Sequence, residues 1–585
     1  MKNARNFLGW VITSAIFLVL VGCGNNAPTA TPTFVLSPTA NATSTSQPTN
    51  APVPTIVPAP TRTITPSPTP FQPFAKIVGA EEVVFDWSKD NCGGPARPDL
   101  PVRAFRDADG MIQLNLSSFR DYRMIGKDLD SLKVDCKSTL VSDWNRDPSH
   151  YNYAEWIGAT YTLDGKTVYA LIHNEWYGEE ASRWSGRLDF GANQGGNNWS
   201  YRSWDGTRYT DMRFDAANNR WQSGSAPGCL IGATWVHPDI GCEPTRTWTS
   251  PVDTTVTVSG SAADSDPGGG DGVVVKIFKG ESELWSATIE NGDAKNYPFN
   301  LAVPVRVGDA IHFRVNARGS PNYDTTNFDL KINVGSDLCP AGKRNQCSMY
   351  ALTFGKSSDG GKTFTHAPAP NHLVAALPYR YQSNGGEFGM WQPSNIVKHP
   401  KDGYYYALFD LIDHRTGQRW HQGMCAARTR TLADPTSWRA WDGKGFDLRF
   451  INPYTETVAD PTKHVCQVVS PNEAGSLSYH LSYNSYFDKF IAAGHDPNLR
   501  VPGFYFSLSD DLVHWTRKQL LMPAMTVHNT SGRTPYFAYP SLVDPSDPSR
   551  NFEVSGQNPY LYYTRFNSMD PLDFDLLRVR VQFSK

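Results

Sequence analysis

The chain has few of the features that mark nucleic-acid-binding, nucleotide-binding or zinc-protease proteins. It holds 54 Lys and Arg against 57 Asp and Glu, a net charge of −3, so no basic excess is present to meet a phosphate backbone. It has no H-E-x-x-H, P-loop or dinucleotide-binding pattern. No long segment repeats apolar residues at helical spacing, so helices are expected to be few. We therefore expect no nucleic-acid partner and no cofactor.

Aromatic and turn-forming residues are abundant. Aromatics make up 12% of the chain, with 17 Trp, and there are 47 Gly and 43 Pro. Such a composition is typical of short strands joined by tight turns. A body of roughly 510 residues exceeds one hydrophobic core, so two or three domains are expected. The composition therefore predicts an all-β protein.

The first residues have the layout of a secretory signal peptide. Lys2 and Arg5 precede an apolar run over 7–21, which is the order of charge and apolarity found in such peptides. The run ends in Leu20-Val21-Gly22-Cys23, which resembles a bacterial lipobox. We therefore expect residues 1–22 to be a lipoprotein signal peptide and Cys23 to carry the lipid. This predicts an exported protein anchored to the outer face of the cell membrane.

A Pro/Thr-rich segment follows over 23–73. It is dominated by Thr, Pro, Ser, Ala and Asn, as in Thr65-Pro66-Ser67-Pro68. So few apolar side chains do not offset the entropy of ordering the chain. We expect a disordered linker that holds the body away from the membrane.

The cysteine count indicates disulfides. Nine Cys are present, and lipidation of Cys23 leaves eight. An even number outside the cytoplasm favours disulfides over a metal site. The sequence does not decide the connectivity. Pairing by proximity joins Cys92 with Cys136, Cys229 with Cys242, Cys339 with Cys347, and Cys425 with Cys466.

One strand pattern recurs five times along the body. A small-polar entry strand leads through a turn, often Asp-Gly, into an aromatic strand, and an Arg- or Ser-rich strand follows. The copies begin at Val102, Trp156, Gln392, Cys466 and Tyr539. One four-stranded sheet does not bury both faces alone, whereas sheets stacked around an axis do. The repeats therefore predict a five-bladed β-propeller.

Two short motifs agree with this prediction. Ser357 to Phe364 (S-S-D-G-G-K-T-F) resembles the Asp box of sialidases and related propellers, a hairpin in which the Asp caps the turn. Ser509 to Trp515 (S-D-D-L-V-H-W) resembles an outer strand of the five-bladed glycosidases of families 43 and 32. The resemblance implies a glycosidase-like propeller, and it concerns the fold more than the chemistry.

The second copy of the pattern is interrupted. Its aromatic strand ends near Tyr177, and the outer strand expected next begins only at Tyr350. We therefore expect an inserted domain over 195–338 that separates the propeller into parts 75–180 and 345–585.

The insertion has its own strand pattern. Between about 247 and 334, alternating apolar strands are separated by Gly/Asp turns, which predicts a β-sandwich. The stretches Gly308 to Val315 and Asp324-Thr325-Thr326 resemble jelly-roll modules attached to bacterial carbohydrate-active enzymes. The aromatic-rich approach over 199–242 is expected to pack against the sandwich or to link it to the propeller.

A Gly-rich loop in the sandwich contains Asp264, Asp266 and Asp271. These oxygens suit Ca²⁺, but the spacing matches no EF-hand. The loop has two interpretations, a Ca²⁺ site and an ordinary polar surface loop.

Carboxyl candidates for catalysis lie where the first strands of a propeller converge on its funnel. Aligning the copies places Asp99 and Glu155 at that rim on neighbouring blades. Glu387 lies in a glycine loop that enters the third blade. Glycosidic cleavage needs one protonated and one ionised carboxyl. The family resemblance also implies an acid on blade three, where this sequence has Gln392 to Asn395, and that departure leaves hydrolysis open.

Further residues suit a sugar or an acidic sugar, because aromatic faces stack on pyranose rings and polar groups bond hydroxyls or carboxylates. The ligand-binding candidates are Arg103, His173, Asn174, Glu175, Trp176, Tyr379, Arg380, Trp391, Gln392, Asn395 and Tyr539. Structural roles are the alternative throughout: strand-end hydrogen bonding for Asp99 and Glu155, contacts between blades for His173 and Glu175, and an ordinary loop carboxylate for Glu387.

These observations predict a monomeric cell-surface glycoside hydrolase acting on poly- or oligosaccharide. A non-catalytic carbohydrate-binding surface lipoprotein is the alternative, and an adhesion or envelope-assembly scaffold is a third hypothesis. Two carboxyls facing each other at about 5–10 Å would separate the first two.

Overall fold

The structure, a computed structural model, describes residues 73–585 apart from 95, 119, 335–338, 340–345, 384, 416–422, 497–498 and 569–572. The expected signal peptide, the lipidated Cys23 and most of the linker lie outside the described residues. The described helices are single turns: α1 (Trp87–Asp90), α2 (Gly178–Ala181), and the 3₁₀ turns η1 (Pro148–His150), η2 (Gly196–Asn198), η4 (Pro435–Ser437) and η5 (Pro461–His464). Among these residues no helix has the length and apolarity needed to cross a membrane.

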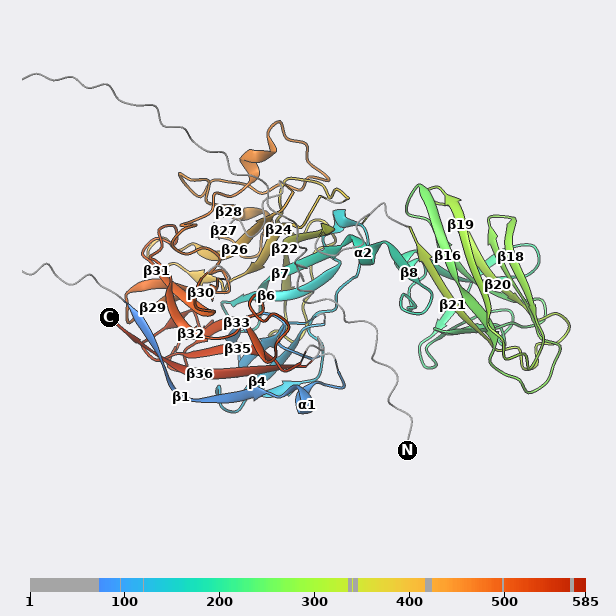
Figure 1. Cartoon of the computed structure of the whole chain (residues 1–585), viewed down its shortest axis with the longest axis horizontal. Coiled ribbons are helices and arrows are strands. Elements are labelled where there is room, and N and C mark those ends of the chain that lie inside the picture. The colour runs from blue at the N-terminus through green and yellow to red at the C-terminus, as the bar shows by residue number, and fades with distance from the viewer. Residues whose placement is uncertain are drawn as a thin grey trace, which may run out of the picture.

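The larger body in Figure 1 is built from four hydrogen-bonded sheets. One of them has nine strands, and we describe it as two groups, the second and third sheets, which are joined by one parallel pair of strands. The first sheet holds β2 (Ala104–Arg106), β3 (Ile112–Leu116), β4 (Tyr122–Gly126) and β5 (Lys133–Asp135). The second holds β6 (Ala154–Thr162), β7 (Val168–Tyr177), β22 (Ser348–Ser357) and β23 (Leu373–Ala375). The third holds β24 (Phe388–Pro393), β25 (Val397–Lys398), β26 (Tyr405–Asp413), β27 (Gly423–Thr429) and β28 (Arg439–Ala440).

The fourth and fifth sheets complete this body. The fourth holds β29 (His480–Asn484), β30 (Lys489–His495), β31 (Gly503–Ser509), β32 (Gln519–Pro523) and β34 (Val554–Ser555). The fifth holds β33 (Tyr536–Val543), β35 (Tyr560–Phe566), β36 (Phe574–Ser584) and β1 (Phe74–Phe85). The first and last described strands, β1 and β36, therefore lie side by side, antiparallel from Phe74↔Ser584 to Phe85↔Leu576. Between the second and third sheets, β22 pairs in parallel with β24 at Met349↔Phe388.

The smaller body in Figure 1 consists of two sheets packed face to face. One holds β9 (Trp199–Trp204), β10 (Tyr209–Asp211), β15 (Glu243–Thr249), β17 (Val273–Lys279), β18 (Ser282–Ile289) and β20 (Ala310–Asn316). The other holds β8 (Arg183–Ser185), β11 (Arg213–Asp215), β12 (Arg220–Gln222), β13 (Leu230–Ile231), β14 (Trp235–His237), β16 (Thr254–Asp264), β19 (Tyr297–Val305) and β21 (Thr326–Asn333). Phe313 of the first meets Phe328 of the second with ring centroids 6.0 Å apart, inside a shared apolar core.

The aromatic-rich approach belongs to the smaller body itself. Trp199, Tyr201 and Trp221 are buried in its core, and the rings of Tyr201 and Trp221 stack at 4.8 Å. The two-sheet arrangement therefore begins well before residue 247, where the sequence pattern first became regular.

The smaller body interrupts the second sheet. β7 ends at Tyr177, and β22 returns beside it from Ser348↔Tyr177 to Ser357↔Val168. Arg146 of the larger body contacts the smaller one, with its Nη2 2.9 Å from Asp189 Oδ1. β22 therefore lies beside β7 although the strands of the smaller body separate the two along the chain.

One predicted strand is wrong. Residues 466–469 were expected to open the fourth copy, but they form no strand there. The backbone N–H of Gln467 donates to Trp441 and that of Val469 donates to Met424, both in the third group of strands. The fourth sheet instead begins with β29, which pairs with β30.

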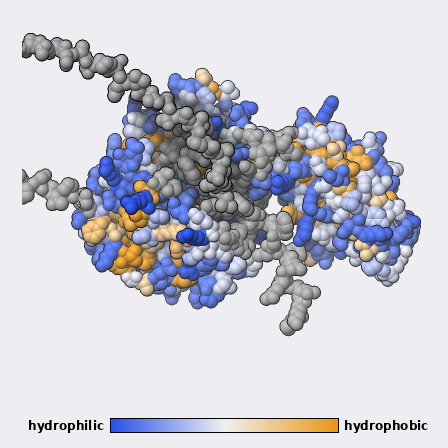
Figure 2. Space-filling view, in the orientation of Figure 1, coloured by the Kyte–Doolittle hydropathy of each residue, from blue (hydrophilic) through white to orange (hydrophobic). Residues whose placement is uncertain are grey.

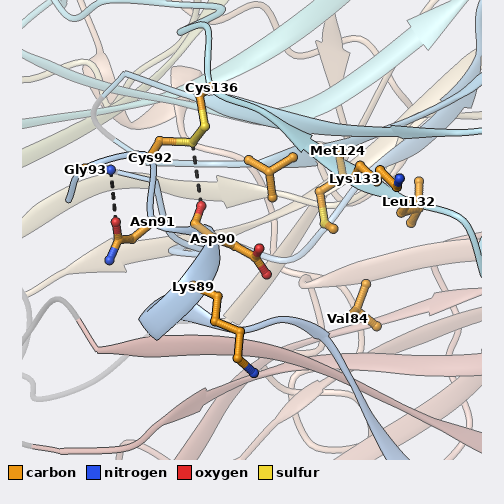
Figure 3. Close-up of a pocket in the computed structure, with 11 residues that line it drawn as sticks. Val84, Lys89, Asp90, Asn91, Cys92, Gly93, Met124, Leu132, Lys133 and Cys136 are labelled. Carbon is orange, nitrogen blue, oxygen red and sulfur yellow. Dashed lines mark hydrogen bonds between the residues drawn. A yellow bond between two sulfur atoms is a disulfide. The ribbon is translucent and has the colours of Figure 1, made fainter.

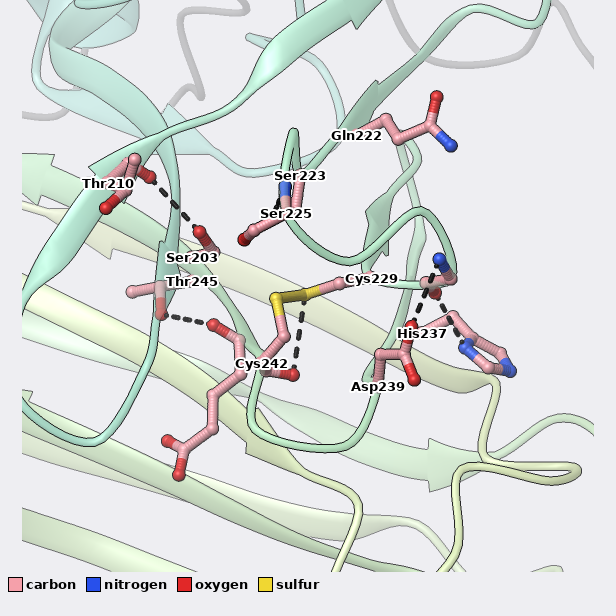
Figure 4. Close-up of a disulfide and its surroundings, with 12 residues drawn as sticks. Ser203, Thr210, Gln222, Ser223, Ser225, Cys229, His237, Asp239, Cys242 and Thr245 are labelled. Carbon is pink, nitrogen blue, oxygen red and sulfur yellow. Dashed lines mark hydrogen bonds between the residues drawn. A yellow bond between two sulfur atoms is a disulfide. The ribbon is translucent and has the colours of Figure 1, made fainter.

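The disulfides join the four pairs expected from proximity: Cys92–Cys136, Cys229–Cys242, Cys339–Cys347 and Cys425–Cys466. Figure 4 shows the Cys229–Cys242 bond in the smaller body, where Gly228 N donates to Asp239 Oδ2 beside it at 3.2 Å. Four disulfides are typical of proteins outside the reducing cytoplasm. Figure 2 shows hydrophilic and hydrophobic residues mixed on the visible faces of both bodies.

The Asp-box resemblance is matched by the hairpin geometry. Oδ1 of Asp359 accepts from the backbone N–H groups of Lys362 (3.1 Å) and Thr363 (3.0 Å). Asp511 likewise accepts from the N–H groups of Val513 and His514. In both places a carboxylate satisfies turn N–H groups that lie outside the strand ladders.

Candidate functional site

A single arginine connects the inner strands of all five sheets. Arg103, just before β2, is 2% exposed. It donates to the carbonyl oxygens of Gly158 (2.8 Å), Pro393 (2.9 Å) and Tyr479 (2.9 Å), and its Nη1 lies 3.4 Å from Ser541 Oγ. Burial lowers the pKa of this guanidinium to about 9, so it stays charged at neutral pH. The predicted ligand-binding residue Arg103 therefore lies where the five sheets meet, with its donors used by the backbone.

The inner strands bulge where they approach Arg103. Register shifts lie between Ile157 and Ala159, between Met390 and Pro393, and between Ala538 and Ser541. A β-bulge takes residues out of the ladder and redirects their neighbours. The carbonyls of Gly158 and Pro393 thereby become acceptors for Arg103. In the third bulge Tyr539 adopts a left-handed φ of 59°.

Side chains from all five sheets form a ring beside Arg103. This ring cluster consists of Asp99, Trp156, His173, Glu175, Trp391, Tyr479 and Tyr539. Two polar contacts lie within it: Tyr539 OH is 3.4 Å from Asp99 Oδ1, and His173 Nε2 is 2.8 Å from Glu175 Oε1. Three pairs of rings also meet, with centroids 4.7 Å apart for His173 and Trp391, 5.7 Å for Trp156 and His173, and 6.2 Å for Tyr479 and Tyr539. Trp156 lies near enough to Asp99, and Trp391 near enough to Tyr479, to lower the pKa of the neighbouring group.

Asp99 is the most deeply placed carboxyl of the ring cluster, at 6% exposure. Burial raises its pKa, and the charge of Glu175 raises it further. The Arg97 guanidinium, with Nη2 3.1 Å from Asp99 Oδ2, opposes both effects. The pKa of Asp99 remains above its ordinary value, which favours the protonated form of this carboxyl.

Glu175 is the second carboxyl of the ring cluster. Its oxygen lies 2.8 Å from Nε2 of His173, with the two side chains almost fully buried. This contact holds the Glu175 carboxyl and the His173 ring together on one face of β7. The predicted ligand residues His173, Glu175, Trp391 and Tyr539 are all brought together here with Asp99.

Glu387 lies beside the ring cluster. It accepts a hydrogen bond from the Tyr350 hydroxyl, and His414 Nδ1 lies 3.4 Å from its other oxygen. The ring of Tyr350 meets Trp391 edge-on at 4.5 Å. Glu387 therefore reaches the site through Tyr350.

Glu155 is not brought to Asp99. It pairs across β6 and β7 with Asn174, whereas Trp156 pairs with His173. Because side chains alternate along a strand, Glu155 and Asn174 lie on the reverse face, away from the ring cluster. Burial raises the pKa of Glu155 to about 8.

The remaining candidates have structural surroundings. Trp176 donates from Nε1 to Arg146 O (3.0 Å), and Arg380 Nε donates to Pro453 O (2.9 Å). Tyr379 lies under the Arg415 guanidinium at 3.5 Å. Asn395 Oδ1 accepts from Leu481 N at 3.5 Å, and Gln392 is fully buried. The structure does not bring these five into the ring cluster.

Sequence reasoning missed Arg97, Trp156, Tyr350 and Tyr479 as site residues. Trp156 is the neighbour of the predicted Glu155. Because side chains alternate along a strand, only one of the two can face the ring cluster, and the sequence alone does not show which. Tyr479 lies just before β29. The sequence pattern starts the fourth copy at Cys466 instead, and therefore does not place Tyr479 at the entry of a strand.

The predicted acidic loop of the smaller body surrounds a buried carboxyl. Asp324 is 2% exposed, and neither of its oxygens accepts a hydrogen bond from the described residues. Burial raises its pKa to about 7, and the charges of Asp271 and Asp264 add to this shift. A cation between these carboxylates would suit oxygen ligands.

A separate hollow of about 420 Å³ lies beside the Cys92–Cys136 disulfide (Figure 3). Val84, Met124 and Leu132 supply apolar walls, and Lys89 and Asp90 supply charge. It shares no lining residue with the ring cluster, and Asp90 is the one carboxylate among its lining residues.

No protein-family model matches the chain, and a search of curated proteins finds no match. Among solved structures, a Dyadobacter fermentans protein of unknown function aligns with TM-score 0.28 and 10% identity over 87% of this chain and 100% of that one. A mutant Trypanosoma rangeli sialidase displaying trans-sialidase activity aligns with TM-score 0.26 and 8% identity, over 86% of this chain and 59% of that one. The C-terminal CBM6 of LamC from Zobellia galactanivorans aligns with TM-score 0.14 and 13% identity, over 23% of this chain and 99% of that one. At these TM-scores the likenesses assign neither a family nor an activity.

Proposed function

We propose that the chain is a cell-surface carbohydrate-active lipoprotein whose five sheets are the blades of a β-propeller. The two-sheet body is then a domain inserted into the second blade. The contacts of Arg103 with backbone or side-chain oxygens of the other four sheets support this arrangement. The pairing of β1 with β36 supports it as well, because a strand from the other end of the chain completes the last blade.

The proposed activity is glycoside hydrolysis with Asp99 as the acid and Glu175 as the ionised carboxylate. One observation carries this assignment: the two carboxyls lie within one ring of side chains, and the surroundings of Asp99 raise its pKa and favour its protonated form. Glycosidic cleavage requires that division of roles. Tyr539 is less suited as a nucleophile, because burial and the charge of Asp99 raise its pKa well above the ordinary value.

Aromatic side chains around the carboxyls supply the surface for a sugar. Trp391 and Tyr539 are the partly exposed members of the ring cluster, and Tyr350 and His173 pack against Trp391. Stacking on an aromatic face is how proteins commonly hold the apolar side of a pyranose. Trp391 is therefore the proposed stacking residue, and Asp99 lies deeper.

A non-catalytic saccharide-binding role is the second candidate. Asp99 is already bonded to Arg97, and Glu175 to His173. The third sheet presents Trp391 and Gln392 on its inner strand instead of an acid. A site built in this way retains the aromatic and polar contacts for a sugar without turnover.

Two further assignments complete the proposal. Lipidation of Cys23 would tether the body at the membrane surface through the Pro/Thr linker. The acidic loop of the smaller body would hold Ca²⁺ near Asp324, Asp264 and Asp271. The ion would give the buried Asp324 carboxylate, whose oxygens accept no hydrogen bond from the described residues, a partner of opposite charge.

A hydrolysis screen tests the proposal. The wild-type chain, Asp99→Asn and the surface control Asp510→Asn would be incubated with aryl-glycosides and polysaccharides, and released sugar measured. Asp510 is 75% exposed and pairs with Lys489. We expect turnover by wild type and control, and a loss of at least about 100-fold in Asp99→Asn. Saccharide binding without turnover in all three would favour the second candidate, and neither binding nor turnover would refute both.

A further inference from the structure

A second polar cluster lies on the reverse face of β6 and β7. Glu155 is fully buried, and neither carboxylate oxygen accepts a hydrogen bond of normal length from the described residues. The backbone N–H of Asp143 is near enough to lower its pKa slightly, but burial outweighs it. Asn174, the cross-strand partner, is 1% exposed, and its amide atoms also have no hydrogen-bond partner in the described part of the chain. Buried polar groups are almost always satisfied, so this cluster calls for a ligand.

Two further side chains converge on Glu155. His366 Nε2 lies 3.7 Å from Glu155 Oε1 and 3.6 Å from Asp143 Oδ2. One ligand atom from each of the three residues lies within 4.8 Å of the others. These separations are too long for good hydrogen bonds. They are close to the edges of roughly 3.3–3.6 Å that a tetrahedral site with bonds of about 2.0–2.2 Å would have.

The His366 ring is oriented for coordination. Its Nδ1 lies 2.9 Å from the carbonyl oxygen of Ala367, which only accepts, so the proton belongs on Nδ1. Nε2 then presents its lone pair to the two carboxylates. A histidine that donates its other N–H to a carbonyl is typical of metal ligands. The ring also stacks on His372 at 4.6 Å, and His372 is held by a bond to Tyr151 O.

The fold brings the three residues together from separate segments. Asp143 lies in the loop before β6, and Asn152 donates to its Oδ2 at 2.7 Å. His366 follows the Asp-box hairpin, which is tied to the same loop by Phe364 N donating to Thr139 O at 2.7 Å. Asp143 is 49% exposed, so the cluster has an open side toward solvent. A ligand would therefore join the loop, β6 and the hairpin.

We propose that Asp143, Glu155 and His366 bind a divalent transition-metal ion with the ligand preference of Zn²⁺, and that this ion is structural. One imidazole nitrogen and two carboxylate oxygens are a donor set that Zn²⁺ accepts, whereas Ca²⁺ prefers six or more oxygens. The open side at Asp143 leaves room for a water as a further ligand. The proposal does not depend on whether the ring cluster hydrolyses a saccharide.

Metal titration of the full chain tests the proposal. After EDTA treatment and removal of the chelator, Zn²⁺, Mn²⁺ and Ca²⁺ would each be titrated by calorimetry, with thermal unfolding followed in parallel. Asp143→Asn changes a half-exposed group and is the variant least prone to misfold, and His366→Gln removes the nitrogen ligand. His514→Ala is the matched control, because His514 also pairs with an aspartate, Asp511, but is 83% exposed. Asp324→Asn separates this site from the acidic loop of the smaller body.

We expect one Zn²⁺ per chain at this site, a higher unfolding temperature in its presence, and weaker binding of Ca²⁺. Asp143→Asn and His366→Gln should each weaken Zn²⁺ binding more than about tenfold, and His514→Ala and Asp324→Asn should leave it unchanged. Absence of Zn²⁺ binding would overturn the proposal, as would binding that both ligand variants retain at full affinity. Preference for Ca²⁺ at this site would overturn it too.

Discussion

Buried carboxyls on the two faces of β6 and β7 differ in whether they are hydrogen-bonded. On the ring face, Asp99 is bonded to Arg97 and Glu175 to His173. On the reverse face, one residue along the same strand from Trp156, Glu155 accepts no hydrogen bond of normal length from the described residues. A satisfied carboxyl pair suits a site that exchanges protons with a ligand, whereas an unsatisfied one suits a site completed by a cation.

The largest effect on stability is expected from removing Arg103, whose side chain joins the strands beside the ring cluster. Arg103→Met would leave the carbonyls of Gly158, Pro393 and Tyr479 buried without their donor. We expect a loss of at least about 4 kcal/mol in the free energy of unfolding, because each unsatisfied group costs about 1–3 kcal/mol. Urea unfolding followed by Trp fluorescence measures it. Arg380→Met, at an exposed arginine, is the control, and equal effects of the two would contradict the role of Arg103.

Asp324 extends the comparison to the smaller body, where another buried carboxyl lacks a partner. Its folded-state pKa of about 7 lies above the ordinary 3.8. Between these values the folded state binds a proton that the unfolded state has lost, so stability falls as pH rises. The expected slope is at most about 1.4 kcal/mol per pH unit, ending near pH 7. Unfolding in EDTA at pH 5 and pH 7 should show it in wild type and not in Asp324→Asn, and an unchanged slope in the variant would contradict this.

Gly158 tests how closely the second and third sheets approach. A Cβ at this position would lie 2.6 Å from Cδ of Pro393. Because that contact is too short, Gly158→Ala should separate the inner strands and cost about 1–3 kcal/mol. Thermal unfolding measures the change. Gly224→Ala is the control, because that glycine has open space around the Cβ position and, like Gly158, no left-handed φ, and an equal loss in both would show that the close approach is unimportant.

The smallest expected effect concerns Glu155 itself. In EDTA-treated protein, Glu155→Gln removes no hydrogen bond, so the free energy of unfolding should change by less than about 1 kcal/mol. Glu175→Gln removes the charge-assisted bond to His173 and should cost about 1.5–3 kcal/mol. Denaturant unfolding of both variants compares them. A larger loss at Glu155 than at Glu175 would mean that the contrast between the faces is wrong.

Local patterns in the sequence predicted local pairings. The turns at Asp109-Gly110 and Asp164-Gly165 lie between paired strands, β2 with β3 and β6 with β7. The interruption after Tyr177 was also visible, because the strand that completes the sheet carries the Asp-box pattern. In contrast, the pairing of β1 with β36 joins the two ends of the body and has no local signal.

The candidate site was predicted in part, because some of its residues have a local signal in the sequence and others do not. Asp99, His173, Glu175, Trp391 and Tyr539 were named from residue type and position at strand ends. Glu155 was chosen where Trp156 faces the ring, because a bulge at Gly158 and the period of two make the facing residue hard to assign from one strand. The partners of Arg103 are mostly backbone carbonyls from other sheets, which leave no mark in the sequence.

A crystal structure of Glu175→Gln soaked with a saccharide that the wild-type chain hydrolyses or binds is the most direct test of the ring cluster as the functional site. We predict a sugar ring stacked on Trp391, with an oxygen of the saccharide within hydrogen-bond distance of Asp99. A saccharide bound only on the smaller body, with the ring cluster empty, would contradict the account.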